Sequence, residues 1–180
     1  MHKLLIVNLI QKIVISILYS PILYLLFRNN IWAIYKSYHN KPKNWKKIIW
    51  NKYMKKHAAS ISIDAQIASP LILPHGVSGI FITQSATIGH NVVVFQQVTI
   101  GANTIEGSKS YGAPHIYDNV YIGAGAKIIG NAIIGTNCRI GANSVVTTEI
   151  PSNSTVVCDK PRIIVHSKTL NNTFSPYLKL

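Results

Sequence analysis

Between Ile116 and Val146 the apolar residues recur at every sixth position. A branched apolar residue opens each block of six, at Ile116, Ile122, Ile128, Ile134, Ile140 and Val146. The fifth position is small or branched, at Val120, Ala126, Ala132, Cys138 and Ser144. A helical face recurs every 3.6 residues and a strand alternates every second residue, so neither explains this period. The pattern predicts a parallel β-helix, in which three blocks close one triangular coil, rather than a β-sandwich with accidental spacing.

The same period extends toward the N-terminus but is interrupted twice. Earlier blocks open at Ile61, Ile67, Leu73, Ile82, Ile88, Val94 and Ile100. The step after Leu73 is nine residues, an insertion of three, and the step after Ile100 is sixteen, an insertion of ten. Repeat proteins place insertions on one face, which is often the binding face. His75 lies in the first insertion and His115 ends the second, so both are candidate catalytic residues.

Histidine is the side chain best suited to accept a proton near neutral pH. We expect His75 to act as a general base on a hydroxyl that attacks a carbonyl, with a structural loop histidine as the alternative. His115 is expected to be catalytic or to orient the substrate. Counting three blocks per coil puts the two on different edges, which favours an active site between subunits. A metal site is the rival, but no short ligand spacing is present, and no metal is expected.

The first 58 residues differ from the repeat in composition. They hold 11 of the 18 Lys and Arg and none of the five acids. Residues 4–27 are mostly apolar, but the run after Lys12 is about 15 residues, short of the roughly 20 that span a bilayer. Lysines interleaved with Trp and Tyr between Lys36 and Lys56 are typical of a segment on an anionic membrane face. Single-stranded nucleic acid or a role as a helical cap on the coil would suit the same composition.

These patterns divide the chain into three parts. We expect a basic, apolar helical N-terminal segment at 1–58, membrane-associated or capping; a β-helix at 59–163; and a C-terminal tail at 164–180. With 48% hydrophobic residues the chain has enough apolar material for a sizeable core, and two cysteines argue against a disulfide framework. Because the apolar run adjoins the lysines, a membrane surface is favoured as partner and nucleic acid is not expected.

Two long stretches carry a resemblance to a known family. LPHGVSGIFITQSATIGHNVVVFQQVTIG and APHIYDNVYIGAGAKIIGNAIIGTNCRIGANSVV resemble the hexapeptide-repeat acyltransferases, over about residues 60–163. Within that family they are similar to serine acetyltransferases and to the related colanic-acid and capsule O-acetyltransferases. The resemblance implies a mainly β fold, a left-handed parallel β-helix preceded by an N-terminal α-helical segment. It also implies a homotrimer with acetyl-CoA as co-substrate in the groove between adjacent subunits.

The resemblance also assigns roles to residues. The family's catalytic histidine falls on His75. Contacts to the pantetheine arm fall on small residues of two blocks, at Gly123, Ala124, Gly141 and Ala142. Small residues suit this role because a thin acyl arm must run close to the backbone. Lys160 and Arg162, at the end of the coil, are expected to meet the CoA phosphates.

Departures from the serine acetyltransferase pattern concern the acceptor. Those enzymes place an Asp just before the histidine and another fifteen residues upstream, where this chain has Pro74 and Ser60. Their second loop reads Arg-His-Pro, where this chain reads Ala-Pro-His at 113–115. Serine needs partners for its ammonium and its carboxylate. We therefore expect an O-acetyltransferase acting on a sugar hydroxyl of a capsular, exopolysaccharide or lipid-linked saccharide, with serine O-acetyltransferase as the alternative.

Two further expectations follow from the same comparison. A lipid-linked acceptor suits a cytoplasmic protein that is peripheral at the inner face of the bacterial membrane. A non-catalytic alternative is a β-helical scaffold or an ice-binding surface. Ice binders need threonines ranked on one flat face, and the threonines of the repeat, Thr83, Thr87, Thr99 and Thr136, do not form such a rank.

Overall fold

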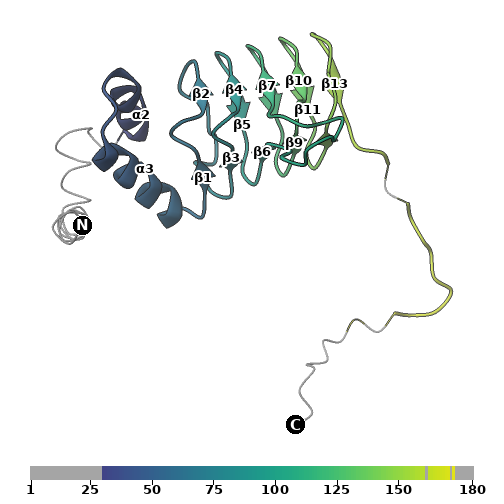
Figure 1. Cartoon of the computed structure of the whole chain (residues 1–180). Helices are drawn as coiled ribbons and strands as arrows, with labels where there is room; N and C mark the ends of the chain where they lie inside the picture. Colours follow the sequence, from purple (N-terminus) through teal and green to yellow (C-terminus); the bar gives the residue numbers. More distant parts are fainter. Residues whose placement is uncertain (1–29, 161, 171, 173–180) are drawn as a thin grey trace.

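Stacked triangular coils make up most of the structure, which is a computed structural model describing residues 30–160, 162–170 and 172. Two helices lie at the N-terminal end of the coils, and the C-terminal segment extends away from the other end (Figure 1). The strands have only two or three residues each, because the chain turns a corner after every strand. The apolar run at 4–27 lies outside the described residues.

Three parallel sheets form the faces of the prism. Sheet A contains, in order, β1 (Ser60–Ile61), β3 (Phe81–Ile82), β6 (Thr99–Gly101), β9 (Lys127–Ile129) and β12 (Val145–Val146). Sheet B contains β2 (Gln66–Ile67), β4 (Thr87–Ile88), β7 (His115–Ile116) and β10 (Ile133–Ile134). Sheet C contains β5 (Val93–Val94), β8 (Tyr121–Ile122), β11 (Arg139–Ile140) and β13 (Thr155–Val156). The chain visits A, B and C in turn, so the predicted parallel β-helix is confirmed.

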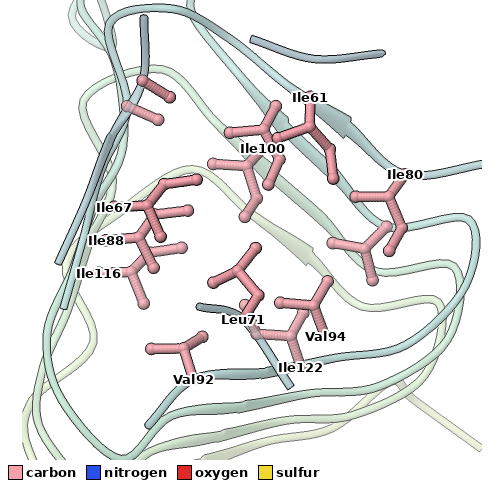
Figure 2. Close-up of a cluster of buried hydrophobic side chains, with 14 of the residues drawn as sticks. Ile61, Ile67, Leu71, Ile80, Ile88, Val92, Val94, Ile100, Ile116 and Ile122 are labelled. Carbon is pink, nitrogen blue, oxygen red and sulfur yellow. The ribbon is translucent and has the colours of Figure 1, made fainter. Parts of the chain in front are cut away.

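The core is a column of branched aliphatic side chains, one from each strand. Ile88 pairs with Ile116 and Ile100 with Ile128, so each inward residue lies on its equivalent in the next coil. These four side chains are at most 1% exposed. Figure 2 shows the residues of successive coils gathered at the sides of one triangle. The second residue of each short strand points inward, which explains why the period is six and why each block opens on a branched residue.

The two insertions leave the prism at different edges. The first lies between Leu73, on the sheet C side, and β3 of sheet A. The second joins β6 of sheet A to β7 of sheet B. Asn103 and Gly112 exchange two backbone hydrogen bonds of 2.8 and 3.0 Å at its base. Both insertions occur at corners because a residue added within a strand would break the pairing with the neighbouring coils.

Helices α2 (Ile31–Asn40) and α3 (Asn44–Lys56) pack on the first coil. Trp50 is fully buried, and its Nε1 donates to the carbonyl of Ile61 at 2.5 Å. The hydroxyl of Tyr35 donates to the carbonyl of Ala65 at 2.6 Å. These contacts occupy polar backbone groups of the first coil, which no other coil among the described residues covers on its N-terminal side. Residues 31–56 therefore form a cap on the β-helix, one of the arrangements that the sequence allowed.

An ion pair also fastens the cap. Lys47 Nζ contacts Asp64 Oδ2 at 2.5 Å, and the hydroxyl of Tyr38 donates to Asp64 Oδ1 at 2.8 Å. The hydrogen bond from Lys47 is the main reason that the pKa of the Asp64 carboxyl lies below its ordinary value. Lys46 is buried, and its Nζ donates to two backbone carbonyls near the end of α2. In the part of the chain that the structure describes, no helix has the length and apolar character needed to cross a membrane.

The tight stacking of coils predicts which glycines resist substitution. A Cβ on Gly135 would lie 2.5 Å from the backbone nitrogen of Ser152, whereas one on Gly101 would meet side-chain atoms alone, the flexible end of Ile129 at 3.1 Å and Thr99 Cγ2 at 3.6 Å. Gly135→Ala should therefore destabilise the protein by about 2 kcal/mol, as overpacking does. Thermal unfolding measures the effect, with Gly101→Ala as the matched control. Equal melting temperatures for the two variants would contradict coil-to-coil packing as the reason.

Candidate active site

His75 lies on the edge between sheets C and A, where equivalent residues of five coils follow one another. Ile72 bridges Val93, so the third residue after each is His75 and Gln96. The pairing of β5, β8, β11 and β13 continues this register through the next three coils. We call the resulting row the histidine edge; it comprises His75, Gln96, Ala124, Ala142 and Cys158.

Hydrogen bonds tie the levels of the histidine edge together. The backbone N–H of Gly125 donates to the carbonyl of Gln96 at 3.0 Å, and that of Asn143 donates to the carbonyl of Ala124 at 2.9 Å. The thiol of Cys158 lies 3.5 Å from the carbonyl of Ala142. The edge is therefore a continuous backbone structure, and its side chains are held at regular levels.

His75 is exposed to solvent but its ring is held on two sides. Its Nδ1 is 2.7 Å from Oε1 of Gln96, and its ring meets Phe95 edge-on with centroids 5.4 Å apart. Because an amide oxygen only accepts hydrogen bonds, Nδ1 is the donor, and in the neutral imidazole Nε2 is then the nitrogen that carries the lone pair. A neutral imidazole with Nε2 free toward solvent is the form that a general base requires.

The residues assigned to the pantetheine arm lie on or beside this same edge. Ala124 and Ala142 belong to the histidine edge, and Gly123 and Gly141 precede them. Packing between coils already requires both glycines, because an added Cβ would lie 2.7 Å from Ala142 N at Gly123 and 2.9 Å from a carbonyl oxygen at Gly141. Their small size therefore has a structural reason, and contact with an acyl arm remains a prediction.

His115 lies elsewhere on the molecule. It is the outward residue of β7 in sheet B, where it pairs with Thr87 and Ile133, and its ring is 4.5 Å from that of Tyr117. In a three-sided prism, the edge between sheets C and A is opposite sheet B. Figure 2 shows this arrangement, with Ile116 of sheet B across the core from Ile80, which precedes β3 of sheet A. One chain therefore does not bring His75 and His115 together.

The two basic residues assigned to phosphate lie beyond the last coil. Lys160 follows Cys158 by two residues and is exposed, and Arg162 is exposed in the segment that leaves the coil. Lys160 and Arg162 thus follow closely in sequence on Cys158, at the C-terminal end of the histidine edge. In the ranges 30–160, 162–170 and 172, no three His, Cys, Asp or Glu side chains are grouped to hold a metal ion.

Sequence reasoning missed Gln96, although the signal was present. His75 stands two residues after the block-opening Leu73, and Gln96 stands two residues after the block-opening Val94. Aligning the blocks coil by coil would have placed Gln96 directly beside His75. The insertion of three residues that follows His75 hides this alignment when the sequence is read continuously.

Comparison with known proteins adds to this geometry. Residues 113–148 match the family described as bacterial transferase hexapeptide (six repeats). Serine acetyltransferases from Staphylococcus aureus are 48% identical to the chain over 93 residues, which is 52% of this chain and 42% of the relative. The Staphylococcus xylosus enzyme matches equally. The chain thus spans less than half the length of the curated relatives that it matches.

Solved structures with a similar fold include serine acetyltransferases. Isoform 3 from Entamoeba histolytica, in complex with cysteine, has a TM-score of 0.63 and 30% identity, covering 77% of this chain and 48% of that one. The Neisseria gonorrhoeae enzyme, in complex with serine, has a TM-score of 0.60 and 32% identity, covering 73% and 53%. A serine acetyltransferase in complex with CoA has a TM-score of 0.58 and 28% identity, covering 69% and 50%.

These relatives correct the expected acceptor. The saccharide acceptor, and with it the capsule and colanic-acid branch, rested on a few loop residues such as Pro74 and Ala113. The match over 93 residues, and the structural likeness over most of the chain, are to serine acetyltransferases instead. The saccharide expectation is therefore wrong, because single loop positions carry less information than the whole repeat. Residues 113–148 of the β-helix thus match the hexapeptide-repeat transferases, and the wider likeness of the chain is to serine acetyltransferases.

Proposed function

We propose that this protein is an acetyl-CoA-dependent serine O-acetyltransferase whose left-handed β-helix carries the active site on the histidine edge. The observation that carries the proposal is His75, held through Nδ1 by Gln96 with Nε2 free, on the same edge as Ala124 and Ala142. The 93-residue match to serine acetyltransferases supports both the donor and the acceptor.

His75 performs the proton transfers of this reaction. Its Nε2 takes the proton of the serine hydroxyl, and the oxygen then forms a bond to the thioester carbonyl carbon. Corner backbone N–H groups that are not already bonded to another carbonyl are the proposed donors for the oxyanion. When the oxyanion collapses, the carbon–sulfur bond breaks, and the imidazolium returns its proton to the CoA sulfur. The products are O-acetylserine and the free thiol.

The histidine edge fits an extended acetyl-CoA. At the positions of the histidine edge that hold His75 and Gln96 in the first two coils, the next two coils have Ala124 and Ala142, which present only methyl groups. A slender pantetheine arm can lie there against the backbone with its thioester toward His75. Lys160, with Arg162 beyond it, would then meet the phosphates at the C-terminal end of the edge.

We further propose a homotrimer with active sites between subunits. His75 and His115 lie on opposite sides of the prism, so only a neighbouring chain can add His115 to the site. Apolar side chains flank the histidine edge, with Phe81 of sheet A 48% exposed and Tyr121 of sheet C 43% exposed. Two cavities, of about 770 and 590 Å³, lie beside the helical cap, and His75 lines neither. A partner surface would enclose this open edge.

Replacing the proposed base tests the reaction. His75→Ala should lower the rate of serine-dependent thiol release from acetyl-CoA by about 10²- to 10⁴-fold, the usual contribution of a general base. Binding of CoA, followed by calorimetry, should persist because the substituted side chain is not needed for it. His90→Ala is the matched control, since His90 is an exposed corner residue. Full activity in His75→Ala would contradict the role of His75 as general base. Absence of thiol release when the wild-type protein is given serine would contradict serine as the acceptor.

Mixed oligomers test the shared active site. His75→Ala and His115→Ala should each be inactive alone, but their co-expression should restore about a quarter of wild-type activity, because half the chains supply each intact histidine at a random interface. Co-expression of His75→Ala with the double variant His75→Ala/His115→Ala is the control and should restore nothing. If the two single variants do not complement each other, the histidines do not meet across an interface.

We also propose that the helical cap faces an anionic membrane surface, which would make the protein peripheral at the cytoplasmic face. Five exposed lysines of the cap and its turn support this: Lys36, Lys41, Lys43, Lys55 and Lys56. Among the described residues the single ion pair is that of Lys47 with Asp64, so these five have no carboxylate partner there. Each lysine near an anionic surface contributes about 1 kcal/mol of attraction.

Vesicle binding tests this surface. Lys55→Gln/Lys56→Gln should weaken binding of the full chain to phosphatidylglycerol vesicles at least about tenfold, because two attractions are lost. High salt should release the wild-type protein, and phosphatidylcholine vesicles should not bind it comparably. Lys109→Gln/Lys168→Gln removes the same charge away from the cap and serves as control. Equal loss in both double variants, or preference for single-stranded DNA over vesicles, would contradict the proposal.

A further inference from the structure

The structure assigns a positioning role to Gln96: its side-chain oxygen fixes the imidazole of His75 with Nε2 directed at the acceptor. This inference rests on the proposed function of His75 as base. The Nδ1 to Oε1 separation of 2.7 Å is a good hydrogen bond. In the resembling serine acetyltransferases an Asp is expected at the position of Ser60. Here Ser60 is the outward residue of β1, and the bond at Nδ1 comes from the next coil instead.

Gln96 is well placed to hold a ring. It is half-buried, and its backbone carbonyl accepts a hydrogen bond from Gly125 at 3.0 Å, so its position is set by the coil that follows. The preceding Phe95 contacts the His75 ring edge-on and also packs against Tyr121 at 5.1 Å. The imidazole is thus fixed both by a hydrogen bond and by an aromatic contact from the same corner.

The insertion that carries His75 is itself tied to both neighbours. The N–H of Gly79 donates to the carbonyl of Ala58 at 3.1 Å, and the N–H of Gln97 donates to the carbonyl of Ser78 at 3.3 Å. Because the backbone of the loop is anchored at its C-terminal end, the motion left to the His75 ring is rotation about its side-chain bonds. The contact with Gln96 removes that freedom, which is how positioned groups gain rate.

An amide differs from a carboxylate in what it does to a base. Both can accept the Nδ1 proton and fix the tautomer, but only a carboxylate also stabilises the imidazolium by charge. The titratable residues on the strands of sheets A and C, which meet at this edge, are Tyr121, Lys127 and Arg139. None of these is a carboxylic acid, and two are cations. Gln96 therefore fixes the imidazole without placing a negative charge beside it.

Two substitutions at one position separate orientation from charge. Gln96→Met keeps the length of the side chain but has no comparable acceptor, so kcat should fall about 10- to 100-fold at every pH while KM for acetyl-CoA stays similar. Gln96→Glu keeps the acceptor and adds charge, so activity should persist at high pH. Its acid limb in the pH profile of kcat/KM should move up by roughly one pH unit, since more of the base is then protonated.

Gln84→Glu is the matched control, because Gln84 is an exposed corner residue between β3 and β4, away from the histidine edge. It adds the same charge and should leave the pH profile in place. Melting temperatures of all variants show whether folding is intact. If the wild-type protein is active, the role of Gln96 would be overturned by a Gln96→Glu pH profile that coincides with the wild-type profile, or by full kcat in Gln96→Met. Either result would leave the proposed function standing. An inactive wild-type protein would instead overturn the proposed function.

Discussion

The structure depends on the pairing between successive coils. Each strand of two or three residues can bond to the coil above and the coil below only if equivalent residues lie at the same level. The inward aliphatic residues enforce this register, because a slip of one residue would turn them outward and expose the core. Glycine at positions such as Gly123 and Gly135 lets the backbones approach closely enough for both conditions to hold.

This constraint decides where function can reside. The faces of the prism and its interior are fixed by the register, so extra residues are accommodated only at corners. The insertion of three residues places His75 on one edge, and the same register brings Gln96 beside it from the next coil. The insertion of ten residues ends at His115 on the opposite side. Chemistry that needs both histidines therefore depends on assembly, which the fold of one chain does not supply.

Much of the fold could be predicted because the repeat depends on residues that are close together in the sequence. The aliphatic residues that open each block gave the coils, the corners and the place of both insertions. The pairing of His75 with Gln96 depends on register across an insertion, which a continuous reading of the sequence obscures. The sequence also did not show that packing requires Gly123 and Gly141, since the neighbouring backbone that excludes a side chain there is visible only in the structure. Contact of these residues with an acyl arm stays a prediction.

The helical cap was harder to predict because its composition satisfies several structures. Trp50, Tyr35 and Lys46 resemble interfacial residues by type, yet all three are buried and bond to backbone carbonyls. A β-helix must cover the open backbone groups of its first coil, and aromatic side chains with one polar atom do this well. The exposed lysines of the cap, such as Lys55 and Lys56, are not used to cover the first coil.

The same register gives the histidine edge a direction. Coils follow one another at about 4.8 Å, so the step from the level of Gln96 to that of Cys158, three coils on, is roughly 14 Å. Between them stand only Ala124 and Ala142, which offer backbone and methyl groups. His75 lies beside Gln96 at one end of this strip, and Lys160 follows its other end. A substrate with a reactive thioester at one end, a thin arm and an anionic group at the other would match that order if His75 is the base proposed above. The reverse orientation would put its anionic group against Phe95 and its carbonyl far from His75.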